Sequence, residues 1–240
     1  MAAPLPLKPA LEMSNVAQHS DRNAGRHNAR GCIVCTSQSR AVFDLLARSL
    51  YLLVQSESER VAFGVTRGFC SFHMWLLRQI GDPLSLSRAW APVVDAWADD
   101  LQRLVDGPTD QAIEHIASAL RGSDSCSVCE AQRATGIGEL TRLVAWLDTP
   151  DGRSEFTRGE GLCLRHLVAA LRVGPSPEVA HFLLGDHVRR LENVSEDLHN
   201  YAAKRDATRR ELINEHEQDA WQRALLLLAG ARTVRDVMPE

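Results

Sequence analysis

The stretch Gly31-Cys32-Ile33-Val34-Cys35 places two thiols three positions apart, and Cys70 and His73 repeat this spacing with a thiol and an imidazole. Donors at positions i and i+3 of a helix lie on the same face, so each pair can chelate one ion. Thirty-four residues separate the two pairs, which is enough for a helical hairpin. The four side chains therefore predict one metal site that ties a turn to a helix.

The same arrangement occurs a second time in the chain. Cys126 and Cys129 are followed, after thirty-three residues, by Cys163 and His166, and the eight positions together use all six cysteines. The likeness extends beyond these donors to a phenylalanine seven positions and a glycine two positions before the third cysteine of each copy (Phe63 and Phe156, Gly68 and Gly161). We predict a tandem repeat in which each copy forms its own Cys3His metal site.

Three thiolates and one imidazole are typical of a closed, tetrahedral zinc site, in which no coordination position is left for a substrate. The sequence therefore predicts two structural Zn2+ ions per chain, one in each copy. An iron–sulfur cluster is the alternative, because imidazole can replace thiolate on one iron. A third interpretation treats the two Cys-x-x-Cys pairs as redox dithiols, but it lacks a βαβ context and leaves Cys70 and Cys163 unused.

The composition indicates an ordinary globular protein. The chain has 240 residues, of which 45% are hydrophobic, so it can bury one or two cores without disulfides. The formal charge of -4 gives no overall attraction for nucleic acid. The first residues lack the apolar stretch of a signal peptide, and no apolar run is long enough to span a membrane. We expect a cytoplasmic protein, whose clustered cysteines bind metal rather than form disulfides.

Apolar residues recur three or four positions apart through most of the chain, and no stretch alternates as a strand would, so the fold is predicted to be all-α. Ser37 or Ser39 is expected to cap the first helix, Pro92 to lie in the first turn of a helix, and 149–152 to form a turn. The predicted units are a flexible N-terminal arm (1–30), a first repeat (31–122), a second repeat (123–175) and a C-terminal helical region (176–240).

Other groups of polar residues are weaker signals. Glu192, Glu196 and His199 have the spacing of half a di-iron site, but no second half accompanies them, so a solvated helix face is expected. The same holds for three further histidines (His181, His187 and His216). The basic residues of 204–210 could contact nucleic acid, yet acidic residues interrupt them. The sequence contains no recognisable catalytic motif, and we predict no catalytic residues.

The chain resembles an uncharacterised bacterial family of helical proteins with a doubled Cys-x-x-Cys and Cys-x-x-His signature. The resemblance covers about residues 30–230 and rests on these motifs: Cys32-x-x-Cys35, Gly68-Phe69-Cys70-x-x-His73-x-Trp75, Cys126-x-x-Cys129, Leu162-Cys163-x-x-His166 and Ala220-Trp221-x-Arg223-Ala224. It implies a metal-binding helical protein of bacterial origin and no assigned activity. The predicted function is non-catalytic zinc binding with recognition of a protein partner; iron–sulfur electron transfer or redox sensing is the alternative.

Overall fold

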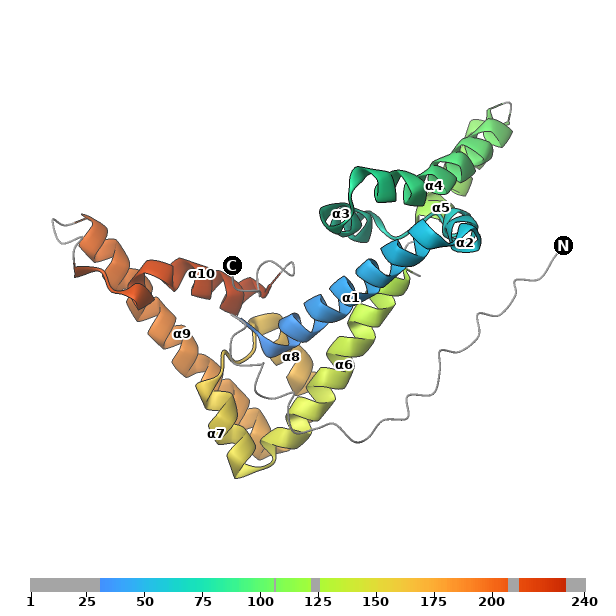
Figure 1. The fold of residues 1–240 in the computed structure, drawn as a ribbon. Helices are drawn as coiled ribbons and strands as arrows, with labels where there is room; N and C mark the ends of the chain where they lie inside the picture. Colours follow the sequence, from blue (N-terminus) through green and yellow to red (C-terminus); the bar gives the residue numbers. More distant parts are fainter. Residues whose placement is uncertain (1–30, 106, 122–125, 207–211, 232–240) are drawn as a thin grey trace.

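The computed structural model describes residues 31–105, 107–121, 126–206 and 212–231. Within these ranges the chain forms ten helices and no strand, so the predicted all-α fold is confirmed (Figure 1). The predicted N-terminal arm lies outside the described residues. No helix in the described ranges combines the length with the apolar content that crossing a bilayer requires.

The helices follow the same order twice. The first series consists of helices of 23, 9, 10, 22 and 13 residues: α1 (Ile33–Gln55), α2 (Glu57–Val65), α3 (Ser71–Ile80), α4 (Pro83–Leu104) and α5 (Thr109–Arg121). The second series has 21, 9, 9, 30 and 15 residues: α6 (Ser127–Leu147), α7 (Pro150–Arg158), α8 (Leu164–Arg172), α9 (Pro177–Asp206) and α10 (Glu215–Ala229).

The first helices of the two series, α1 and α6, form the centre of the molecule. They lie side by side and run in opposite directions (Figure 1). Gln38 lies in the second turn of α1 and Gln132 in the second turn of α6. Gln38 Nε2 donates a hydrogen bond to the carbonyl oxygen of Gln132 at 3.0 Å, so the two helices cross near their starts. Each long helix therefore starts inside the half of the molecule that belongs to the other series.

Two separate cores lie along this pair of helices. One gathers buried residues of α6 to α9, yet it also includes Cys32 and Val34 from the start of α1. The other gathers buried residues of α1 to α4 and includes Cys126 and Val128 from the start of α6. Removing these side chains from water supplies roughly 1.5–3 kcal/mol for each large apolar residue. The cores thus hold the beginning of each long helix against the opposite series.

Several helix boundaries differ from the sequence predictions. Helix α1 begins at Ile33 with Cys32 as its N-cap, so neither Ser37 nor Ser39 caps it. Helix α4 begins at Pro83, where the Asp82 side chain accepts from two backbone N–H groups, and Pro92 lies in the helix interior instead of its first turn. The predicted turn at 149–152 is also wrong, because Thr149 caps α7 and Pro150 is its first residue.

The charged stretch before the last helix differs from the exposed helix that its composition suggests. Helix α9 ends at Asp206, and α10 begins after Asn214, which forms a capping box with Glu217. Glu217 is buried and accepts hydrogen bonds of 2.6 and 2.8 Å from Lys204 Nζ. Hydrogen bonding from Lys204 lowers the pKa of the Glu217 carboxyl group. This pair fixes the start of α10 against α9.

Two helical glycines provide a test of how closely α2 and α4 pack. A Cβ on Gly64 would lie 2.7 Å from the carbonyl oxygen of Pro92, whereas a Cβ on Gly138 would meet nothing within 4 Å. We expect Gly138→Ala to raise the free energy of unfolding by about 0.5–1 kcal/mol, because alanine restricts the unfolded chain. Gly64→Ala should lower it by about 1–3 kcal/mol through overpacking. Chemical denaturation measures both, and equal stabilisation by the two changes would contradict the described contact.

Candidate metal centres

The eight predicted donors come together, but not in the predicted groups. They form two quartets, which we name site 1 (Cys32, Cys35, Cys163 and His166) and site 2 (Cys70, His73, Cys126 and Cys129). In each quartet the sulfur and nitrogen atoms all lie within 4.8 Å of one another. The prediction that each sequence copy forms its own site is therefore wrong: the Cys-x-x-Cys pair of either copy meets the Cys-x-x-His pair of the other.

The length of α1 explains why the pairs cross. Its 23 residues rise about 34 Å, and the 9 residues of α2 can bring the chain back by only about 13 Å. Residues 66–70 would have to be almost fully extended to make up the difference, but backbone hydrogen bonds from Arg67 and Gly68 to α2 turn the chain there. Cys70 therefore stays away from the start of α1, where Cys32 lies. Because α6 is antiparallel to α1, its first residues reach the point to which the chain does return, and Cys126 takes the place that Cys32 cannot.

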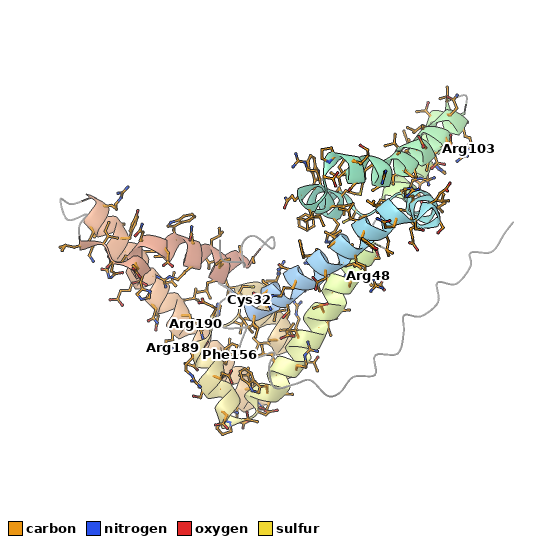
Figure 2. The ribbon with its side chains drawn as sticks, viewed as in Figure 1. Cys32, Arg48, Arg103, Phe156, Arg189 and Arg190 are labelled. Carbon is orange, nitrogen blue, oxygen red and sulfur yellow. The ribbon has the colours of Figure 1, made fainter. Side chains whose placement is uncertain are left out.

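Site 1 lies where α1 begins, next to α8 and near Phe156 and Arg190 of the second series (Figure 2). His166 Nδ1 is 3.3 Å from each of the three sulfur atoms, and Cys35 Sγ is 3.8 Å from Cys163 Sγ. All four residues are buried, with Cys163 fully inaccessible. A backbone hydrogen bond of 3.4 Å from Ile33 N to the Gly161 carbonyl oxygen also joins the two segments.

Site 2 repeats this geometry at the start of α6 and α3. His73 Nδ1 lies 3.2, 3.6 and 3.4 Å from the sulfur atoms of Cys70, Cys126 and Cys129, and the Cys70 and Cys129 sulfur atoms are 3.7 Å apart. Cys126 and His73 are buried, but Cys70 and Cys129 are only partly buried. Site 2 is therefore the more accessible of the two quartets.

These spacings suit a single ion with four ligands. Four donors around a tetrahedral zinc ion, with Zn–S about 2.3 Å and Zn–N about 2.0 Å, lie about 3.5–3.8 Å from one another. The sulfur–sulfur separations of 3.7 and 3.8 Å fall in this range, and the nitrogen–sulfur separations of 3.2–3.6 Å lie close to its lower end. They are too long for a disulfide, which needs about 2.05 Å between sulfur atoms. The six cysteines are accordingly free thiols in the structure.

Local backbone geometry aims the donors inward. The first cysteine of each pair is the N-cap of a helix, and in none of the four does the side chain form a cap hydrogen bond (Cys32, Cys70, Cys126 and Cys163). The sulfur atoms are thus free to face the partner pair, while the positive end of the helix dipole favours thiolate. Gly68 and Gly161, with φ of +77° and +72°, make the turn before the third cysteine of each copy.

The protonation of site 1 reflects close contact between its own donors. Burial opposes a charged His166, but hydrogen bonds to Cys163 and Cys35 outweigh it and raise the pKa of the imidazole to about 9. Hydrogen bonds from Cys32 and Cys35 lower the pKa of Cys163, whereas burial and the thiols of Cys163 and Cys35 raise the pKa of Cys32. The quartet therefore shares its protons unequally, and a cation would replace them.

The thiols of site 2 also differ in pKa, but the pKa of its histidine shifts in the opposite direction. Burial lowers the pKa of His73, so that its imidazole is neutral and can donate a lone pair to a metal. Burial and the neighbouring thiols of Cys70 and Cys126 raise the pKa of Cys129 to about 12. Burial opposes the thiolate of Cys126, but backbone N–H groups, first that of Cys70, lower its pKa overall. The thiolate form is therefore favoured at Cys126 and the thiol form at Cys129.

The end of α10 covers site 1, which the sequence did not indicate. Gly230 follows the helix with φ of +75°, and a Cβ there would lie 2.9 Å from Cys163 Sγ and 3.0 Å from Cys35 Sγ. Gly31, at the other side of the site, also lies next to this helix, and a Cβ there would be 3.5 Å from Leu226 Cδ2, an ordinary contact distance. A glycine directly after the last apolar residues of a helix is a recognised C-terminal signal, but its contact with the thiols depends on the tertiary fold.

The remaining polar groups singled out in the sequence form no third quartet within the described residues. Glu192, Glu196 and His199 are exposed on α9, as expected of a solvated face. His187 is an exception: it is buried beside the segment that leads to Cys163, and burial lowers its pKa. The prediction that His187 lies on a solvated surface is therefore wrong.

Comparisons of the chain with protein-family models, with curated proteins and with solved structures found no match. The resemblance to a bacterial family of helical metal-binding proteins therefore stays a prediction.

The crossed grouping can be tested with cysteine pairs. In a variant that retains Cys35 and Cys163 but carries serine at the other four cysteines, mild oxidation should form a disulfide, because the two sulfur atoms are 3.8 Å apart. The matched variant that retains Cys35 and Cys70 should stay reduced. Trypsin digestion and non-reducing mass spectrometry identify the joined peptides, and efficient Cys35–Cys70 linkage would contradict the crossed arrangement.

Proposed function

We propose that this chain is a non-catalytic, helical zinc-binding protein that holds two Zn2+ ions, one at site 1 and one at site 2. The observation that carries the proposal is the convergence of four donor atoms within 4.8 Å at each of two places. Each ion would then fasten the start of a long helix to the short helix of the opposite series. Structural zinc contributes roughly 10–16 kcal/mol to folding in small zinc-binding peptides.

Zinc suits the quartets better than an iron–sulfur cluster does. A cluster contains several iron and sulfide ions, so its protein ligands stand further apart than ligands of one ion. The sulfur separations of 3.7 and 3.8 Å support this choice, because they suit four donors around one ion. Four protein donors also fill the tetrahedral positions of zinc, which argues against a catalytic ion that would need an open position.

We also propose that the two helix series are a tandem repeat of five helices each, over residues 31–121 and 126–231. This would join the predicted second repeat and the predicted C-terminal region into one unit. The order of helix lengths and the equivalent positions of the donors support it. A bacterial, cytoplasmic origin remains part of the proposal and rests on the sequence alone.

A protein partner is the proposed target of the exposed surface. On α10, Trp221, Leu225 and Leu228 follow one another at helical spacing, and each side chain is more than half exposed. Apolar helix faces of this kind are typical of docking surfaces for another protein. We therefore propose that the zinc ions hold the scaffold and that the scaffold presents such a face.

Anaerobic purification followed by metal quantification tests the zinc proposal. We expect two zinc ions per chain and a colourless protein. A brown protein with visible absorption and stoichiometric iron would overturn it in favour of an iron–sulfur protein. Absence of any stoichiometric metal would remove the proposed function altogether.

Paired substitutions should reveal the crossed sites in the zinc content. Cys70→Ser with Cys126→Ser removes two ligands of site 2, so we expect the variant to keep one zinc ion per chain. Cys32→Ser with Cys70→Ser removes one ligand from each site, and this variant should lose or greatly weaken both ions. Zinc quantification after dialysis against a weak chelator measures the difference. The reverse pattern would mean that the sites form within each sequence copy.

A change at Gly230 should act on site 1 alone. Gly230→Ala introduces a strained backbone conformation and a methyl group against two sulfur atoms, so we expect it to weaken zinc binding at site 1 and destabilise the protein by about 1–3 kcal/mol. Gly174→Ala is the matched control, because Gly174 has φ of +85° but open space around it. Chelator titration should show that one of the two zinc ions is bound more weakly in Gly230→Ala and that neither is in Gly174→Ala. Two unchanged ions in Gly230→Ala would mean that α10 does not cover site 1.

A further inference from the structure

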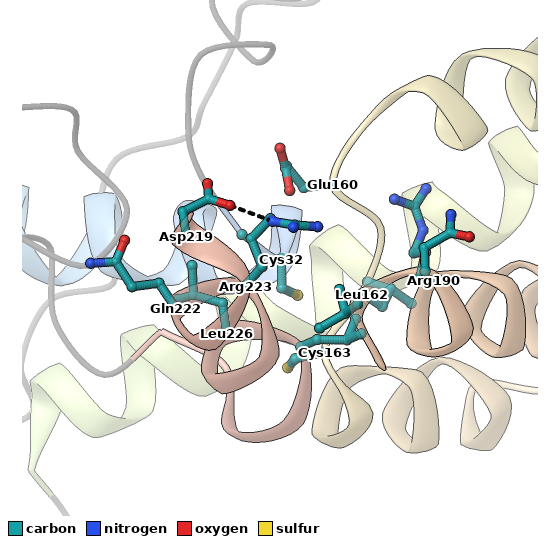
Figure 3. A pocket seen from close by; sticks show the side chains of 13 residues that line it. Cys32, Glu160, Leu162, Cys163, Arg190, Asp219, Gln222, Arg223 and Leu226 are labelled. Atoms are coloured by element: carbon teal, nitrogen blue, oxygen red, sulfur yellow. Dashed lines mark hydrogen bonds and ion pairs between the residues drawn. The ribbon is translucent and has the colours of Figure 1, made fainter. Parts of the chain in front are cut away.

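A pocket of about 220 Å³ leads to site 1. It lies between the loop before α8, the start of α1, and helices α9 and α10, and Cys32 and Cys163 form part of its lining (Figure 3). Figure 3 shows Glu160 on one side of the pocket and Cys163 on the other, with Cys32 between them. The space thus reaches site 1 at Cys32, which keeps 2% exposure, whereas Cys163 lies in the wall with no accessible surface.

The pocket is important for metal access because the donors of site 1 are buried. Cys32 and Cys35 are each 2% exposed, and Cys163 is 0% exposed. A metal ion cannot reach such a quartet from the surface unless a path leads to the sulfur atoms. Site 2 is different, because Cys70 and Cys129 are partly exposed and can meet an incoming ion directly.

The two arginines of the pocket are already engaged by other groups. Arg190 donates from all three nitrogen atoms, to Asp186 and to the carbonyl oxygens of Phe156, Thr157 and Gly159. Its charge is offset by Asp186, a carboxylate that also pairs with Arg189, and by the C-terminal end of α7. The three Arg190 nitrogen atoms are thus bonded to protein acceptors.

Arg223 is compensated in the same way. Its Nε donates to Asp219 at 2.7 Å, and its Nη2 donates to Asp197 at 2.7 Å. The guanidinium group thus faces two carboxylates, and although burial opposes its charge, the bonds to Asp197 and Asp219 raise its pKa overall. Arg223 is held against α9 and α10 as part of the wall.

Glu160 is the lining carboxylate that lacks such compensation. It is exposed, and within the described residues it has neither a hydrogen bond nor an ion pair. Apolar side chains form much of the remaining wall (Leu162, Val194, Leu226 and Leu227). A free carboxylate beside an apolar wall that ends at thiols is suited to a cation on its way to those thiols, because carboxylate oxygen is itself a zinc ligand.

We propose that this pocket is the route by which Zn2+ reaches and leaves site 1, and that Glu160 is the first protein ligand that the incoming ion meets. The inference rests on the proposed zinc function and adds a pathway to it. A pocket of about 220 Å³ holds about seven waters at the liquid volume of about 30 Å³ each, which is enough for a hydrated ion. The bound waters and the thiol protons would leave through the same opening.

Replacement of zinc by Cd2+ in the full-length, zinc-loaded protein tests this route. Cadmium bound to thiolates absorbs in the ultraviolet, so its arrival can be followed by absorbance. The Cd2+ concentration is kept in the range where the exchange rate still depends on it. We expect a fast phase from site 2 and a slow phase from site 1. The Cys163→Ser variant assigns the slow phase, because it lacks a ligand of site 1.

Two variants alter the route without touching a site 1 ligand. Glu160→Gln removes the charge at the opening and should slow the site 1 phase about 3-fold to 10-fold, because the local concentration of cations falls. Asn193→Trp places a large ring on an exposed lining position of α9. We expect this ring to obstruct the pocket and to slow the site 1 phase at least as much as Glu160→Gln does. Glu192→Gln and Glu192→Trp are the matched controls, since Glu192 is exposed on α9 but does not line the pocket. The site 2 phase should be unchanged in all four.

The outcomes separate the route from the zinc proposal. If the protein binds two zinc ions and both pocket variants exchange at the wild-type rate, the pocket is not the route, although the zinc function stands. If no zinc is bound, the zinc function itself fails. If Asn193→Trp folds poorly, the salt dependence of exchange in Glu160→Gln provides the test. Added salt should slow the site 1 phase more in the wild type than in Glu160→Gln, because salt screens the charge of Glu160. Equal salt dependence in the two proteins would overturn the proposal.

Discussion

The structure depends on a crossed connection between two chelating pairs and two antiparallel helices. Cys32 and His166 of site 1 are 134 residues apart in the sequence, whereas Cys70 and Cys129 of site 2 are 59 apart. Closing loops of these lengths, in place of the shorter loops within each copy, costs only about 1 kcal/mol more, because loop entropy grows with the logarithm of length. The apolar contacts between α1 and α6 easily exceed this cost, so the packing of the long helices decides which donors meet.

The composition of the sites was therefore predictable from the sequence, and the pairing was not. Cys-x-x-Cys and Cys-x-x-His pairs present their donors in the same way whichever partner they meet, so local spacing cannot distinguish Cys70 from Cys163 as the partner of Cys35. The deciding quantity is the uninterrupted length of α1, which carries the chain too far from Cys35 for α2 to bring it back. Only the full extent of that helix, from Ile33 to Gln55, makes the constraint visible.

Some predicted helix boundaries were wrong because the same residue types that end one helix also begin the next. Asp82-Pro83 and Thr149-Pro150 both suggest a break, and each does follow the end of a helix. In both cases, however, the polar side chain caps a new helix and the proline takes its first position, where a missing N–H is harmless. The buried Glu217 likewise could not be recognised from a charged stretch, because its partner Lys204 is brought to it by the fold.

The two sites have the same donors but different surroundings, and this difference comes from the last helix of each series. Helix α10 packs on α8 and α9 and ends with Gly230 against the sulfur atoms of site 1, whereas α5 packs mainly on α4. The cover keeps the four donors of site 1 buried, and burial strengthens the charge interactions among them. Site 2 keeps two partly exposed thiols. If both sites bind an ion as proposed, equal ligands would give unequal exchange rates, because the rate depends on access as well as on the donors themselves.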